Sequence, residues 1–192
     1  MIRATRRRVL AGSVAAGVAG TLAVPASARI GGVAEAVAGR SGRALLLHDP
    51  ALAAGRRFAA AGAGAGGAAL AIEGDRIRFA RAALETGPAL VAGVSRHADA
   101  LLIADVAREA GYEQVAELRG DGAALVTQRC RDGWHGLARL AGAAGDAWVE
   151  ALAIYAATAG ESAADFHPAP VRGSARPGGR DTVLGWVLAP RA

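Results

Sequence analysis

The sequence predicts an α/β protein, a two-layer or three-layer sandwich in which helices cover a mostly parallel sheet. Short apolar runs recur at intervals of about 23 residues, and a segment with helical periodicity follows each of them. Asp, Ser, Gly and Pro mark the boundaries between these segments. After the third repeat the pattern changes, and the rest of the chain indicates a hairpin, a long helix and a closing strand.

Three short apolar segments are predicted to be buried strands. Each is uncharged and consists mainly of Ala, Leu and Val, which is typical of strands that are covered on both faces. The three segments are Ala44–Leu47, Ala68–Ile72 and Ala89–Val94. Because a helix is expected after each strand, we expect the three strands to lie parallel and side by side in one sheet.

A helix is predicted after each of these strands. The three helices are Pro50 to about Ala61, Arg76 to about Glu85, and Arg96 to Ala110. Asp49, Asp75 and Ser95 precede them, and side chains of these types accept hydrogen bonds from the free N–H groups of a first helical turn. All three are therefore predicted to be N-terminal caps.

The second half of the chain has a different pattern. Asp121-Gly122 lies between the strand candidates Gln114–Leu118 and Ala123–Gln128, and Asp-Gly between two strands is a hairpin signal. Trp134–Ala159 has the periodicity of a helix, which Gly145-Asp146 can divide into two. Thr182–Leu188 is predicted to be the closing strand. Residues 161–180, rich in Pro, Gly and Arg, have no predicted structure, and such a loop is unusual in a compact domain.

The first 28 residues have the features of an export signal. Arg6, Arg7 and Arg8 directly precede an uncharged apolar run from Val9 to Val24. Ala26-Ser27-Ala28 then provides the small-x-small pattern at which signal peptidase cleaves, with Ala26 and Ala28 as the small residues. The segment resembles a bacterial twin-arginine signal peptide.

That resemblance implies a partner and a location. The partner is the twin-arginine translocon, which carries proteins that have already folded, and the destination is the periplasm or the extracellular space. The run of 16 residues from 9 to 24 is shorter than the roughly 20 that a spanning helix needs, so we expect no stable membrane anchor after cleavage. The expected organisation is a signal at 1–28, a lead-in at 29–43 and a single α/β domain at 44–192.

The charge balance argues against nucleic acid as a partner. The chain has 22 basic and 17 acidic residues, but four of the arginines lie in the signal, which has no acidic residue. The remaining 18 basic residues nearly balance the 17 acidic ones, without the concentrated block of positive charge that nucleic-acid binders carry.

The single cysteine, Cys130, cannot form an intramolecular disulfide, which agrees with folding in a reducing compartment before export. No haem, iron–sulfur or other metal signature is present in the sequence, and no cofactor can be named.

The best candidate site follows from the predicted topology. In an open parallel sheet, ligands bind beyond the carboxyl ends of the strands. These ends carry candidate catalytic side chains together with two candidate ligand-binding ones. The catalytic candidates are His48, Asp49, Glu73, Ser95 and His97, and the ligand-binding candidates are Asp75 and Arg96. Two histidines with carboxylates can bind a divalent metal or transfer a proton. The alternative is that they are helix caps and ordinary exposed loop residues.

Two motifs in the same region are incomplete. Gly93-Val94-Ser95 resembles the start of a hydrolase nucleophile elbow, but position 97 is histidine where that motif has glycine. Gly62–Gly67 matches G-x-G-x-x-G, but it follows a predicted helix and precedes a strand, the reverse of the order in a dinucleotide site.

These observations leave three functions open. The first is an exported accessory or ligand-binding module, which an export signal joined to a domain without a catalytic motif favours. The second is a small periplasmic enzyme that uses the His, Asp, Glu and Ser side chains at the strand ends. The third is a non-catalytic subunit exported together with a cofactor-bearing protein partner.

Overall fold

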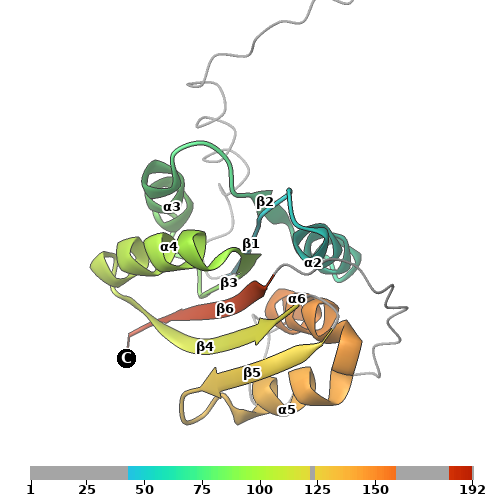
Figure 1. The fold of residues 1–192 in the computed structure, drawn as a ribbon. Coiled ribbons are helices and arrows are strands. Elements are labelled where there is room, and N and C mark those ends of the chain that lie inside the picture. The colour runs from blue at the N-terminus through green and yellow to red at the C-terminus, as the bar shows by residue number, and fades with distance from the viewer. Residues whose placement is uncertain (1–42, 122–123, 159–181, 192) are drawn as a thin grey trace, which may run out of the picture.

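One six-stranded sheet organises the protein. The computed structural model describes residues 43–121, 124–158 and 182–191. Their strands have the spatial order β2-β1-β3-β6-β4-β5 (Figure 1). The strands are β1 (Ala44–His48), β2 (Ala69–Ala71), β3 (Leu90–Ser95), β4 (Tyr112–Gly120), β5 (Leu125–Cys130) and β6 (Val183–Pro190).

The sheet is mixed, and the prediction of a mostly parallel sheet is not confirmed. β1 pairs in parallel with β2 and with β3, as expected for strands joined through helices. β6 pairs antiparallel with β3 and with β4, and β4 pairs antiparallel with β5. The closing strand therefore enters the middle of the sheet, between the parallel strands and the hairpin. A local sequence pattern does not indicate which strands β6 will pair with.

Helices cover both faces of the sheet, which gives three layers (Figure 1). One face packs against α2, α5 and α6, and the other packs against α3 and α4. The helices are α2 (Ala53–Gly64), α3 (Arg76–Leu84), α4 (His97–Glu109), α5 (His135–Ala144) and α6 (Trp148–Thr158), with a 3-10 turn at Gly145–Ala147.

Most predicted elements are present, with changes at their ends. The predicted hairpin is confirmed by the antiparallel pairing of β4 and β5, while Gly122 of its predicted turn lies outside the described residues. The predicted long helix is divided into α5 and α6 at Gly145, whose positive φ of 57° suits glycine. The first helix begins at Ala53 and not at Pro50, because Asp49 and Pro50 form a separate turn before it.

The centre of the core is built from two tryptophans packed against glycines. Trp186 on β6 lies over Gly93 of β3, where an added Cβ atom would come within 2.3 Å of the indole ring. On the other face Trp148 of α6 packs against Gly185, where an added Cβ atom would lie 2.7 Å from the ring. Both rings are almost completely buried. Glycine at these two positions therefore makes room for the largest side chains of the core.

Several sequence predictions lie outside the described residues. These are the signal arginines, the cleavage site, the lead-in up to residue 42 and the loop at 161–180. Within the ranges that the structure describes, no helix has both the length and the apolar character needed to cross a membrane.

The packing of Trp186 on Gly93 predicts a large effect of a single methyl group. We expect Gly93→Ala to lower the free energy of unfolding by about 1–3 kcal/mol, because the indole ring cannot move within a filled core. Urea denaturation followed by tryptophan fluorescence measures this change.

Gly64→Ala is the matched control, because an added Cβ atom there meets nothing within 4 Å. Gly64 is the last residue of α2, and we expect its substitution to leave stability unchanged or slightly raised. Equal effects of the two substitutions would contradict the proposed packing.

Candidate functional site

The carboxyl ends of β1, β2 and β3 meet at one edge of the sheet, as predicted. The three strands are direct neighbours, with β1 between the other two. The backbone bonds continue past the strand ends, since Asp49 N–H donates to the Val94 carbonyl (3.0 Å) and Ile72 N–H donates to the His48 carbonyl (2.8 Å). The predicted site residues therefore do lie near one another, and their individual contacts decide what they can do.

Asp49 is buried and has a structural role. One carboxylate oxygen accepts a hydrogen bond from Ala51 N–H (2.9 Å), and the other forms an ion pair with Arg96 (2.9 Å). Its side chain is 5% exposed, whereas that of Arg96 is 56% exposed. The carboxylate thus joins the end of β1 to the end of β3. Asp49 was expected to cap the first helix, but the residue at that position is Leu52, which makes no side-chain cap.

Ser95 is also committed to the fold. Its side chain is fully buried, and its oxygen accepts a hydrogen bond from the Trp186 indole N–H (3.1 Å) while its hydroxyl donates to the Arg96 carbonyl (3.1 Å). The predicted helix cap is wrong, because α4 begins after Arg96 and receives no side-chain cap. A serine held in this way has no histidine at its hydroxyl, so these contacts do not favour a nucleophile.

His48 is the unsatisfied group at this edge. Its Nδ1 atom is buried and has no hydrogen-bond partner. Burial lowers the pKa of His48 below its usual 6.5, and the nearby carboxylates of Asp49 and Glu73 oppose this effect only in part. The imidazole is therefore neutral at neutral pH. Glu73 is exposed at the end of β2 and faces solvent.

The two remaining candidates are exposed. Asp75 caps α3 as predicted, with its carboxylate accepting hydrogen bonds from Ile77 N–H (3.0 Å) and Arg78 N–H (3.1 Å). These bonds lower the pKa of Asp75. His97 begins α4 and lines a small crevice of about 10 Å³ on the α4 side of the sheet. Neither residue joins His48 in a common group.

The predicted edge is therefore only partly assembled. The structure joins Asp49 to Arg96, and it sets His48 near Asp49 and Glu73. Ser95, Asp75 and His97 serve other contacts. Among the described residues, no group of three or more His, Cys, Asp or Glu side chains is arranged to hold a metal ion.

A second candidate site, which the sequence did not reveal, lies on the hairpin. The register between β4 and β6 shifts between Gln114 and Ala116, which makes Val115 the extra residue of a β-bulge. Val115 and Ala116 both pack into the core beneath α6. Gln114 and Glu117 lie on the opposite face, beside α4. The bulge therefore leaves no side chain between Gln114 and Glu117 on that face.

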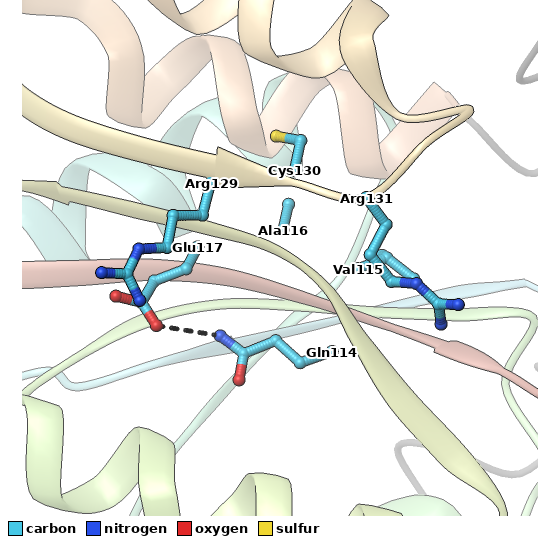
Figure 2. A pocket seen from close by; sticks show the side chains of 7 residues that line it. All are labelled: Gln114, Val115, Ala116, Glu117, Arg129, Cys130 and Arg131. Atoms are coloured by element: carbon cyan, nitrogen blue, oxygen red, sulfur yellow. Dashed lines mark hydrogen bonds between the residues drawn. The ribbon is translucent and has the colours of Figure 1, made fainter.

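A hollow of about 300 Å³ occupies this part of the hairpin (Figure 2). Its lining comes from the two strands of the hairpin and the residue that follows β5, and consists of Gln114, Val115, Ala116, Glu117, Arg129, Cys130 and Arg131. Figure 2 shows Gln114, Glu117 and Arg129 on the α4 side of the strands, whereas Cys130 points to the opposite side. The hollow thus presents an amide, a carboxylate and guanidinium groups. We call it the bulge hollow.

The charges around the bulge hollow are unequally paired. The Glu117 carboxylate accepts a hydrogen bond from the Gln114 amide (3.4 Å) and forms an ion pair with Arg119 (3.5 Å). Arg131 pairs with Glu113. Arg129 is exposed and forms no ion pair or hydrogen bond with any described residue. One guanidinium at the bulge hollow is therefore available for an outside anion.

The face that carries the bulge hollow is open. The core beneath α2, α5 and α6 extends to Leu125 and Cys130 of β5. The core beneath α3 and α4 reaches β6 and the start of β4 but includes no residue of β5. Alternate residues of a strand share a face of the sheet, and Thr127 and Arg129, which lie on the same face as Glu117, are both exposed. We call the side of the hairpin that carries Glu117, Thr127 and Arg129 the open face.

Cys130 is half-buried and forms no disulfide. Burial raises the pKa of its thiol, so the thiolate is scarce at neutral pH. Cys130 packs against the core beside Tyr155, away from the open face.

Comparison with known proteins gives no relative. No protein-family model, no curated protein and no solved structure matches this chain.

The depressed pKa of His48 predicts a loss of stability in mild acid. The folded protein binds fewer protons at this site than the unfolded chain, whose histidine has its usual pKa of 6.5. The free energy of unfolding should therefore decrease as the pH falls below about 6.5. Urea denaturation at several pH values between 7.5 and 5 measures this decrease.

His48→Asn removes the titrating group and keeps a polar side chain at the end of β1. We expect the free energy of unfolding of this variant to fall less steeply with decreasing pH than that of the natural protein. Parallel pH profiles for the two proteins would show that His48 is not responsible.

Proposed function

We propose that this chain is an exported, non-catalytic binding module that engages a protein partner through the open face of β4 and β5. The observation that carries the proposal is the unequal covering of the sheet. Among the described residues, helices pack over β5 on one side only, and the other side of the hairpin carries the bulge hollow and an arginine without an ion pair. Bulges next to a sheet edge commonly re-aim side chains toward a ligand.

The contacts at the strand ends favour binding over catalysis. Asp49 and Ser95, two of the five candidate catalytic residues, are buried and bonded to other parts of the fold. His48 has no proton donor or acceptor at its buried Nδ1 atom. An enzyme that used these residues would have to break the contacts that join β1, β3 and β6.

A helix-sized area is missing from one layer. Neighbouring strands lie about 4.8 Å apart, so two strands span roughly the 10 Å width of one packed helix. On the face opposite the open one, α5 occupies the corresponding place beside β5. A partner that covered the open face would complete the third layer of the sandwich.

The export part of the proposal has its own test. A folded reporter protein fused after residue 28 should reach the periplasm, because Arg6 and Arg7 match the twin-arginine pattern. Arg6→Lys combined with Arg7→Lys should leave the reporter in the cytoplasm. Cell fractionation measures the distribution, and export that persists without both arginines would contradict the assignment.

The binding part is tested by photo-crosslinking in the native host. We expect a photoreactive amino acid in place of Thr127, on the exposed middle of β5, to yield a discrete crosslinked partner. The same amino acid in place of Arg78, exposed on α3, is the control. Equal products from both positions, or none from Thr127, would contradict binding at the open face.

A further inference from the structure

We propose that the outer edge of β5 accepts an extended segment of the partner as an additional strand, and that Arg129 selects a segment with a carboxylate side chain. This inference rests on the proposed function, because it specifies how the partner binds. It combines two observations: a sheet edge with exposed backbone and a guanidinium without an acidic partner.

β5 is suited to strand addition. It is the outermost strand of the sheet on that side, and it has six residues, twice the three of β2 at the opposite edge. Protein edges are usually protected by short strands, by charged residues or Pro, by β-bulges, or by a covering helix. β5 has an irregularity at Val126 and the charged Arg129, but residues 127–130 pair with β4 in regular register, contain neither Pro nor Lys, and have no described helix over their open face. An added strand would bond to its free backbone groups.

The side chains of β5 favour the same interaction. Val126 and Thr127 are β-branched, which suits a strand in a sheet. Val126 is 70% exposed, and it is the unpaired residue where the hairpin register shifts, since Thr127 lies opposite Arg119 and Leu125 opposite Gly120. An additional strand would bury part of this apolar side chain.

Arg129 provides the selectivity. It lies opposite Glu117 in the hairpin register, on the open face beside the bulge hollow. Glu117 already contacts Gln114 and Arg119, so its charge is shared. A residue of an added strand that faced Arg129 on its other side would be its direct cross-strand neighbour. A carboxylate at that position would neutralise the guanidinium, whereas a lysine would be repelled.

A second copy of the chain fits this edge less well. The sequence of β5, Leu125 to Cys130, has no acidic residue, so pairing between two copies of β5 would bring no carboxylate from the added strand to Arg129. An acidic segment of another protein matches the charge of the edge. Self-association is therefore an outcome that the experiment has to detect.

The test uses the purified full chain and short peptides of known sequence. The probe is a fluorescein-labelled, amidated peptide Val-Thr-Val-Glu-Val-Thr-Val, compared with peptides that have Gln or Lys in place of Glu. We expect saturable binding in fluorescence anisotropy titrations, with the Glu peptide binding about two- to fivefold more tightly than the Gln peptide and the Lys peptide binding most weakly.

Two variants separate charge selection from general attraction. Arg129→Glu should reverse the order, so that the Lys peptide binds most tightly. Arg78→Glu makes the same change of charge at an exposed position on α3 and should leave the order unchanged. If Arg129→Glu does not change the order, the assignment of Arg129 is overturned.

A change in the peptide tests the strand addition itself. N-methylation of alternate peptide bonds removes backbone donors without altering the protein, and it should weaken binding by about tenfold or more when the methylated groups face β5. The methyl groups are introduced in both alternating sets. If neither set weakens binding, or if the Glu peptide shows no saturable binding, the proposal is wrong.

Two further results distinguish this inference from the proposed function. A discrete partner crosslinked at Thr127, together with failure of the peptides, would leave the binding module intact and overturn strand addition. A protein that dimerises with increasing concentration in size-exclusion chromatography, and loses the dimer on Arg129→Glu, would make a second copy the occupant and overturn the acidic-segment proposal.

Discussion

The rest of the structure depends on the insertion of β6 between β3 and β4. This strand comes from the end of the chain and forms antiparallel pairings on both sides. Without it, the parallel strands and the hairpin would share no backbone bonds. Its Trp186 packs against Gly93 on one face of the sheet, and its Gly185 leaves room for the Trp148 ring on the other face. Backbone pairing and side-chain burial therefore act at the same place, and both halves of the core depend on β6.

The same insertion determines the chemistry at the strand ends. The Trp186 indole N–H donates a hydrogen bond to the Ser95 hydroxyl oxygen. A nucleophilic serine would instead need a base, such as a histidine, beside its hydroxyl group. Asp49 satisfies the turn after β1 and holds Arg96 at the end of β3. A buried carboxylate without these contacts would be costly, so its partners are part of the fold. Asp49 and Ser95, which the sequence offered as catalytic candidates, therefore hold the ends of the strands together.

The proposed function rests on the part of the sheet that no described helix covers. The helices α3 and α4 pack over the parallel strands, β6 and the start of β4, and their core includes no residue of β5. The bulge at Val115 turns two consecutive side chains into the core and leaves a hollow on the outside. Within the part of the chain that the structure describes, the charged groups that line the hollow are paired except for Arg129. The proposed interaction surface thus results from the limited extent of α3 and α4 together with one extra residue in β4.

The sequence was enough to predict the local elements: the three apolar strands, the helix cap at Asp75, the hairpin of β4 and β5, and the break at Gly145. These depend on neighbouring residues, so a short window contains the information. It also indicated that the turns after β1, β2 and β3 meet. Three features became visible only in the folded molecule: β6 enters the centre of the sheet, Ser95 bonds to Trp186, and no described helix covers one face of β5. These features join distant residues, such as Ser95 and Trp186, which are 91 positions apart. Their free energies come from burial and strand pairing, which depend on residues outside any short stretch of sequence.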